Sequence, residues 1–425
     1  MFGGDLIEPE TTGNLIVEFE DSATTQDMLR ILGQVADGQV AAASDFAGEG
    51  AVVSAGGLDA VMFETLKTAV VRVDEASSAA AALNAEQHVR QARPEFYFYP
   101  IDWASRRRGW LSEGVKLLVD FEGEPSPGRA EADFAETLHS AASTWGVEAV
   151  GALANAALTG AGIRVAVLDT GFDLGHPDFA GRTIQAFDLT GSPFGADDRQ
   201  GHGTHVAGTV CGPAKPAGGA PRYGVAPEAE LFVYKVLNDS GRGTESQIHG
   251  GMDRAIAAGC VVMNMSLGRP AGQGAQPDAM YERLGRRALQ AGTLIVAAAG
   301  NNSARDLGHI APVGYPANSP SILAVGALDR NLKVATFSCG GLNGGGGAVD
   351  MGAPGVDVLS AAPRSRGGYA SLQGTSMAAP HVTGLAALVA QQTGLRGEPL
   401  WLELIRRARR LSLPPRDAGA GLSRL

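Results

Sequence analysis

The sequence predicts an α/β protein built on a doubly wound, mostly parallel sheet, preceded by a smaller α+β domain of ferredoxin-like arrangement. Two observations predict this. From Trp145 onward, short β-branched runs alternate with helical segments, which favours a parallel sheet covered on both faces. Before residue 104, the expected elements follow the order β-α-β-β-α-β. The chain has 425 residues, 44% of them apolar, which is enough for two such cores.

The smaller domain is expected over residues 1–103. Alternating apolar and β-branched runs predict its strands, and segments rich in Ala, Leu and Glu predict its helices. The expected strands are residues 14–20, 39–43, 66–73 and 89–100, and the expected helices are residues 25–32 and 77–86.

The larger domain is expected over residues 144–425. Its expected strands are residues 163–168, 231–236, 260–265, 293–298, 321–325 and 356–359, and its helices include residues 247–258, 278–291 and 382–391. In open parallel sheets, ligands bind outside the carboxyl ends of the strands. Polar residues that directly follow these strands are therefore the first candidates for a functional site.

Residues 104–143 are predicted to form a linker or a processed segment. They open with the arginine run 106–108 and then become acidic around the sequence PSPG. Such a run is typical of a solvated loop, and a processing site is the alternative interpretation.

Charge and cysteine content exclude some classes of protein. A net charge of −11 argues against a nucleic-acid partner. Three widely spaced cysteines, Cys211, Cys260 and Cys339, predict buried free thiols rather than a disulfide or metal framework. The start of the chain lacks the features of a secretory signal, and no apolar run is long enough to span a membrane. We expect a cytoplasmic protein with no membrane partner; secretion by another route is the alternative.

Asp169 and His202 are the first two candidates for chemistry. Asp169 ends the strand IRVAVLD before Thr-Gly, where an acid is held in place, although a turn or capping Asp has the same pattern. His202 lies in GHGTHVAG, where two histidines three residues apart also suggest zinc. Zinc usually takes a third ligand, or a Glu within H-E-x-x-H, and neither is present.

Asn301 and Ser376 are the other two candidates. Asn301 closes the strand TLIVAAAGN, where its amide can donate to an oxyanion, although a turn Asn has the same pattern. Ser376 lies in GTSMAAPH, ahead of a long apolar helix. A serine at a helix start can be a simple cap, but the same position offers N–H groups and a positive dipole end to a developing negative charge.

Together and in this order, these residues resemble the subtilisin family (subtilases). The matching segments are VAVLDTGFDLGHPDF, GHGTHVAGTV, NMSLGRP, AAAGNN and GTSMAAPHVTGLAALV, and the resemblance extends from Trp145 to Leu425. It implies a serine endopeptidase with Ser376 as nucleophile, His202 as general base and Asp169 as the residue that orients the base. It also implies that the Asn301 amide and the Ser376 N–H bind the oxyanion, and that the chemistry requires no cofactor.

The resemblance further implies how a peptide or protein substrate is bound in an extended conformation. The implied substrate-binding residues form two strand-like edges and the S1 pocket: Ser266, Leu267 and Gly268 on one edge, Gly241 and Gly243 on the other, with Ala298, Ala299, Gly300 and Gly314 around S1. Because the S1 residues are small and neutral, we expect a preference for large apolar or aromatic P1 side chains. Arg242, on the rim, is either a solvated surface side chain or a partner for acidic residues further along the substrate.

The N-terminal domain resembles the inhibitory and chaperone-like propeptide of this family. The resemblance implies that the segment from Tyr99 to Asp102 enters the cleft as a product-like tail, and that the chain is an autoprocessed zymogen cut between residues 103 and 144. An unrelated N-terminal binding domain is the alternative.

The resemblance also suggests a structural calcium ion, for which Asp178 is a weak candidate. The loop at residues 212–221 supplies no carboxylate or amide side chain, whereas calcium takes six to eight oxygen ligands.

Two other functions remain open at this point. A peptide ligase or macrocyclase uses the same fold and acyl-enzyme, with an amine in place of water. A pseudoenzyme that only binds peptides is the third hypothesis, against which the complete triad argues.

Overall fold

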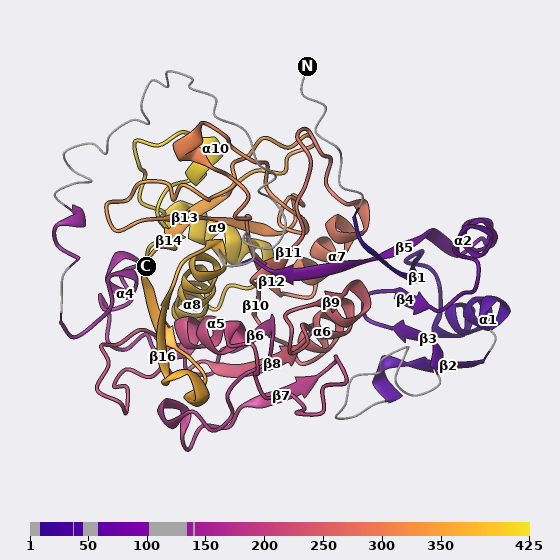
Figure 1. The fold of residues 1–425 in the computed structure, drawn as a ribbon, viewed down its shortest axis with the longest axis horizontal. Helices are drawn as coiled ribbons and strands as arrows, with labels where there is room; N and C mark the ends of the chain where they lie inside the picture. Colours follow the sequence, from indigo (N-terminus) through magenta and orange to yellow (C-terminus); the bar gives the residue numbers. More distant parts are fainter. Residues whose placement is uncertain (1–8, 37, 46–57, 102–133, 139–140) are drawn as a thin grey trace.

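The computed structural model describes residues 9–36, 38–45, 58–101, 134–138 and 141–425. Figure 1 shows a large body with a smaller N-terminal domain beside it, and a long strand that runs from the domain into the body. Asp102 and the arginine run 106–108 lie outside the described residues.

The large body contains the predicted parallel sheet. Within the described chain this sheet has seven strands, every pair of them parallel. In spatial order they are β14 (Met351–Pro354), β13 (Leu323–Leu328), β12 (Leu294–Ala298), β10 (Val262–Met265), β6 (Arg164–Asp169), β8 (Glu230–Lys235) and β7 (Gln185–Asp188). The sheet confirms the expected fold class of the larger domain.

Helices cover both faces of this sheet (Figure 1). On one face lie α5 (His202–Cys211) and α8 (Thr375–Thr393), and on the other lie α6 (Glu245–Ala257) and α7 (Ala279–Gln290). Alternation along β6 shows why: Val165 and Val167 pack in the α5 cluster, whereas Ala166 and Leu168 pack in the cluster of α6 and α7. Shorter helices are α4 (Trp145–Ala149), α9 (Gly397–Arg407) and α10 (Pro415–Ala418).

One strand was assigned to the wrong sheet. Residues 356–359 were expected in the parallel sheet, but β15 (Val358–Ala361) pairs with β16 (Tyr369–Leu372) in a separate antiparallel hairpin. The edge strand next to β13 is β14 instead, and β7, the strand at the opposite edge, was not predicted either. The sequence of β14, Met-Gly-Ala-Pro, contains no β-branched residue, so composition does not reveal it.

The N-terminal domain is a second sheet with two helices. Its elements are β1 (Thr11–Phe19), α1 (Thr25–Val35), β2 (Gln39–Ala42), β3 (Leu58–Phe63), β4 (Thr68–Val71), α2 (Ala76–Asn84) and β5 (Val89–Pro100). The sheet order β5-β1-β4-β3-β2 is ferredoxin-like when β2 is set aside as an added edge strand. Both helices pack on one face of the sheet, around Leu15, Met28 and Leu83.

Two predictions within this domain were wrong. Strand β3 was missed, and it takes the place expected of residues 39–43, which form only the edge strand β2 parallel to it. The expected strand 66–73 is shorter, because Leu66 and Lys67 belong to a turn in which Lys67 has a φ of 52°. A left-handed residue cannot be part of an extended segment, so the strand begins only after Lys67, and alternation alone does not report this.

The other face of the N-terminal sheet packs against α6 and α7. Ile16, Val70 and Phe98 share one apolar cluster with Ile248 and Leu284, so a continuous core crosses the interface. Charged pairs surround it. Arg93 donates twice to the buried carboxylate of Glu245, at 2.8 and 2.9 Å, and Arg283 pairs with the buried Glu18.

The described part of the expected linker packs on the large body. The guanidinium groups of Arg409 and Arg424 lie 4.1 and 4.7 Å from the centroid of the Phe134 ring. Leu138 is buried beside Trp145. The three cysteines are free and buried, as expected. In the described ranges, no helix has both the length and the apolar character needed to cross a bilayer.

Candidate active site

The four candidate residues lie together at the carboxyl edge of the main sheet. Asp169 is the last residue of β6, Asn301 follows β12, and His202 and Ser376 lie in the first turns of α5 and α8. Because α5 and α8 pack against each other, their first turns are held at the same edge of the sheet.

Asp169 and His202 form a buried pair. The Nδ1 atom of His202 is 2.8 Å from Oδ1 of Asp169, and this same oxygen accepts the N–H of Thr170 at 2.7 Å. A carboxylate only accepts hydrogen bonds, so Nδ1 carries the proton and Nε2 carries the lone pair. This is the tautomer that a general base requires.

The start of α5 is fixed by the buried carboxylate of Asp198. It accepts the N–H groups of Gly201 and Thr204 at 2.7 and 2.9 Å and the hydroxyl of Thr170 at 2.9 Å. Gly201 has a φ of 101°, which favours glycine. These contacts hold the first turn of the helix, and therefore His202, against the end of β6.

Ser376 lies against the carbonyl group of Ile101, the residue that follows β5; we call the segment from Tyr97 to Ile101 the tail. Its hydroxyl donates to the carbonyl oxygen of Ile101 and lies 3.0 Å from that of Ser266. The turn before it requires glycine: Gly374 has a φ of 153°, and a Cβ there would lie 2.8 Å from the Asn301 amide nitrogen. Gly374 therefore keeps open the space that the carbonyl oxygen occupies.

Asn301 holds the same carbonyl from its other side. Its Nδ2 donates to the oxygen of Ile101 at 2.9 Å. Its Oδ1 accepts both the N–H and the hydroxyl of Thr375, each at 2.9 Å. Because Thr375 supplies two donors to Oδ1, the amide is oriented with its N–H₂ group toward Ile101. The arrangement can therefore stabilise negative charge on this oxygen.

Strand β5 lies between two short edge strands. On one side, β11 (Leu267–Gly268) pairs antiparallel with Tyr99 and Pro100, and the N–H of Ile101 donates to the Ser266 carbonyl at 3.2 Å. On the other side, β9 (Gly243–Thr244) pairs antiparallel with Tyr97 and Phe98. The tail is thus extended and bonded through its main chain on both sides, the geometry of a bound peptide.

Two of the remaining candidate substrate residues, Gly241 and Gly268, lie beside side chains of the tail. A Cβ on Gly241 would lie 3.2 Å from Cγ of Pro100, and one on Gly268 would lie 2.7 Å from Cδ1 of Ile101. Ile101 packs against the apolar cluster that contains Ala298. Beyond it, Ala299 is followed by Gly300 and accepts the N–H of Gly314 at 2.9 Å. Small residues therefore bound the space around Ile101.

Sequence reasoning missed several contributors to this site. Phe98 is fully buried, with its ring 5.6 Å from that of Tyr281, and its pocket was not predicted. The orienting role of Thr375 and the capping role of Asp198 were also missed. The segments GTS and DDRQGHGT carry these residues, but only their hydrogen bonds reveal what each holds.

Arg242 is occupied by the N-terminal domain. Its guanidinium carbon lies 3.5 Å from the ring centroid of Tyr97, and it forms an ion pair with Glu10. Glu10 also accepts the hydroxyl of Tyr99 at 2.5 Å. An acidic side chain therefore already lies beside Arg242.

His205 does not form a zinc site with His202. Its Nε2 lies 3.0 and 3.1 Å from the carbonyl oxygens of Val358 and Ala370, so this nitrogen donates. Burial, assisted by neighbouring His202, lowers the pKa of His205 to about 3, which keeps the ring neutral. Among the residues that the structure describes, no group of three or more His, Cys, Asp or Glu side chains is placed to hold a metal ion.

Asp178 is surrounded by hydrogen-bond donors rather than by further oxygen acceptors. Its carboxylate accepts the hydroxyl of Tyr223 at 2.6 Å, that of Tyr369 at 2.9 Å and the N–H of Ala217 at 2.6 Å. Burial, together with Asp178 itself, raises the pKa of Tyr223 far above its ordinary value, so the phenol keeps the proton it donates. A calcium ion needs acceptors at these positions, so this donor set does not fit one.

Replacing Tyr223 with phenylalanine should therefore destabilise the protein. The change removes one donor from a buried carboxylate, which costs about 1–3 kcal/mol and should lower the thermal unfolding midpoint. Tyr315→Phe is the control, because its hydroxyl makes an exposed hydrogen bond with Gln276, at 3.2 Å. A calcium-dependent midpoint that Asp178→Asn abolishes would contradict this interpretation.

Comparison with known proteins gives consistent matches. The sequence profile of the subtilase family matches residues 160–410. M-protease of Shouchella clausii (strain KSM-K16) is 42% identical over 273 residues, which are 64% of this chain and 66% of that protein. Subtilisin BL of Lederbergia lenta is 44% identical over 250 residues, 58% of this chain and 84% of that protein. Subtilisin E of Bacillus subtilis (strain 168) is 36% identical over 289 residues, 67% and 70% of the two chains.

The matched range includes the four candidate residues but not the N-terminal domain. Asp169, His202, Asn301 and Ser376 all lie within residues 160–410, whereas the described N-terminal domain ends at Ile101. The chain spans just under two thirds of the length of M-protease.

Proposed function

Because the chain belongs to the subtilase family, we propose that it is a serine endopeptidase whose nucleophile is Ser376, whose general base is His202 and whose orienting carboxylate is Asp169. One observation carries the proposal. The carbonyl oxygen of Ile101 accepts the Ser376 hydroxyl and the Asn301 amide, while its own strand is bonded on both sides. This is the position that a scissile carbonyl must take.

The proposed reaction assigns each of these residues a role. Ser376 Oγ attacks the carbonyl carbon while Nε2 of His202 takes the hydroxyl proton, and the carbonyl oxygen becomes an anion. Asn301 Nδ2 donates to that anion, assisted by the Ser376 N–H that the family resemblance implies. His202 then gives the proton to the leaving amine, and the C–N bond breaks to leave an ester on Ser376. Water then attacks the ester while His202 takes one of its protons, and His202 gives that proton to Ser376 Oγ as the C–O bond breaks and the acid is released.

The N-terminal domain is the enzyme's own first substrate in this proposal. The carbonyl at the nucleophile belongs to the peptide bond between Ile101 and Asp102, so cleavage there produces a domain that ends at Ile101. This bond lies just before the interval 103–144 in which the sequence suggested the cut. The domain is thus an intramolecular inhibitor in the uncut chain, and the same contacts then retain it as a bound inhibitor after the cut.

The interface with α6 and α7 supports this inhibitory role. An apolar core, the Arg93–Glu245 pair and the Ser246 N–H, which donates to buried Glu95 at 2.8 Å, join the two parts. Because these contacts are remote from the cut bond, they persist after cleavage. They also suggest how the domain assists folding, since it covers an apolar surface that α6 and α7 otherwise expose.

The tail predicts which substrates are preferred. Ile101 occupies the P1 position among small neutral residues, and Phe98 occupies a buried P4 position beside Tyr281. We expect apolar P1 side chains to be accepted and charged ones to be disfavoured, since S1 offers them no partner.

The test combines labelling with a peptide series. A fluorophosphonate should form an adduct on Ser376 of the activated protein, located by peptide mass spectrometry. Peptides containing Phe-Tyr-Pro-Ile should be cut after Ile, and P1 Lys or Asp should lower kcat/KM at least about tenfold. Absence of an adduct would favour a peptide-binding pseudoenzyme. A product joined to an added amine, with little hydrolysis, would favour a ligase.

A further inference from the structure

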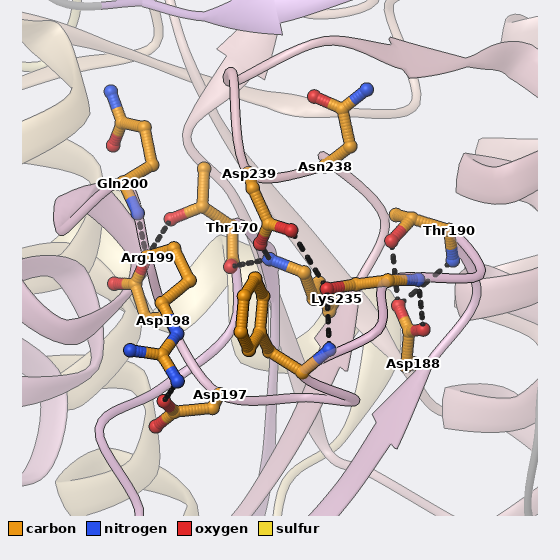
Figure 2. Close-up of polar contacts among 12 residues, drawn as sticks. Thr170, Asp188, Thr190, Asp197, Asp198, Arg199, Gln200, Lys235, Asn238 and Asp239 are labelled. Carbon is orange, nitrogen blue, oxygen red and sulfur yellow. Dashed lines mark hydrogen bonds and ion pairs between the residues drawn. The ribbon is translucent and has the colours of Figure 1, made fainter.

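Lys235 is a fully buried cation that the proposed reaction does not use. It ends β8, directly beside Asp169 in the neighbouring strand β6. Its Nζ donates to the carbonyl oxygen of Thr170 at 2.5 Å and lies 3.0 Å from Oδ1 of Asp239 (Figure 2). Burying an ammonium group is costly unless it is paired and hydrogen-bonded, so these two contacts are what make the position tolerable.

The first partner, Thr170, is the residue through which the catalytic pair is held. Its N–H donates to the Asp169 carboxylate at 2.7 Å. Its hydroxyl accepts the N–H of Gly203 at 2.8 Å and donates to Asp198 at 2.9 Å. Movement of Thr170 would therefore displace both the carboxylate of Asp169 and the first turn of α5, which carries His202.

The second partner, Asp239, lies in the turn that leads to the substrate-binding edge. Asn238 closes this turn by accepting the N–H groups of Ser240 and Arg242, each at 3.0 Å. Strand β9 follows directly and pairs with Tyr97 and Phe98. The carboxylate of Asp239 also accepts the Ser192 hydroxyl at 2.8 Å. Partial burial acts to raise its pKa, but hydrogen bonds from Lys235 and Ser192 prevail and lower it.

We propose that Lys235 is a positioning residue that ties the strand end bearing Asp169 to the turn that carries the substrate-binding edge. Its contact with Thr170 fixes the catalytic pair, and its contact with Asp239 fixes where β9 lies relative to that pair. The inference rests on the proposed peptidase function. It assigns the two contacts different effects: the first acts on kcat, and the second acts on KM for substrates that reach β9.

Two substitutions separate these effects. Lys235→Met retains much of the volume but removes both contacts, so kcat per active site should fall at least about tenfold. Asp239→Asn leaves the contact with Thr170 in place, so kcat should stay within about twofold. Its KM should rise about three- to tenfold for a Tyr-Phe-Tyr-Pro-Ile anilide and stay unchanged for a Pro-Ile anilide, which does not reach β9.

Active sites are counted by fluorophosphonate titration, and Lys333→Met, at an exposed lysine, is the control. The proposal is overturned if Lys235→Met matches this control in kcat and differs only in thermal midpoint. It is also overturned if Asp239→Asn raises KM equally for both substrates. Should Lys235→Met fail to fold, the two-substrate comparison with Asp239→Asn decides alone. Lack of labelling in the wild-type protein would instead contradict the peptidase function itself.

Discussion

Replacing Ser376 with alanine should leave the bond between Ile101 and Asp102 intact, so the purified variant should have the mass of the full chain. The wild-type protein should instead yield a fragment whose carboxyl terminus is Ile101. The reason is that the Ile101 carbonyl already contacts the Ser376 hydroxyl and the Asn301 amide in the wild-type protein. The variant therefore lacks only the nucleophile. Intact-mass spectrometry of both proteins checks the result.

The loss of activity in Ser376→Ala should be nearly complete, and combining it with the His202 substitution should cause no further loss. Members of a triad act as a unit. The kcat of Ser376→Ala, of His202→Ala and of the double variant should therefore each be lower than that of the wild type by at least about 10⁴-fold. Ser371→Ala, at an exposed serine of β16, should process normally. A fragment ending at Ile101 from the Ser376 variant, purified without active enzyme, would show that another protease makes the cut.

Replacing Asn301 with alanine should lower kcat by about 10²–10³ while KM changes little. The amide donates to the oxygen that becomes negative, so its contribution is largest in the transition state. Asn302→Ala is a matched control, because that neighbouring side chain is exposed. Steady-state kinetics on a Phe-Tyr-Pro-Ile anilide give both constants.

A smaller substitution tests how the amide is oriented. Thr375→Val keeps the side-chain shape but removes the hydroxyl that donates to Asn301 Oδ1, while the Thr375 N–H contact remains. We expect Thr375→Val to lower kcat about tenfold, a larger loss than that of the control Asn302→Ala and a smaller loss than that of Asn301→Ala. If Asn301→Ala raised KM and left kcat unchanged, the amide would bind the ground state of the substrate rather than the oxyanion.

The sequence was sufficient for most of the parallel sheet, and the four residues that it singled out as candidates lie at one edge of that sheet. Strands such as β6 and β12 are continuous apolar runs, which is typical of strands buried on both faces. Strand β14 was missed because its Met-Gly-Ala-Pro sequence has little intrinsic strand preference. It is a strand only because β13 pairs with it.

The binding edges illustrate a different limit. Strands β9 and β11 are two residues long, and each is a strand only because β5 pairs with it from more than a hundred residues earlier in the chain. Register between such distant segments is set by side-chain packing, here by Phe98 in its pocket and Ile101 against Gly268. No local pattern shows that Ile101, rather than a neighbour, meets Ser376.

Strand β5 has one further consequence. It is a single strand of twelve residues whose first part pairs with β1 and whose last part pairs with β9 and β11. The end beside Ser376 is therefore anchored through the same strand that pairs with β1. Under the proposed inhibition, the lifetime of the inhibited state should follow the folding stability of the whole N-terminal domain, so a nick far from Ser376 should shorten it as effectively as weakened contacts at Ile101.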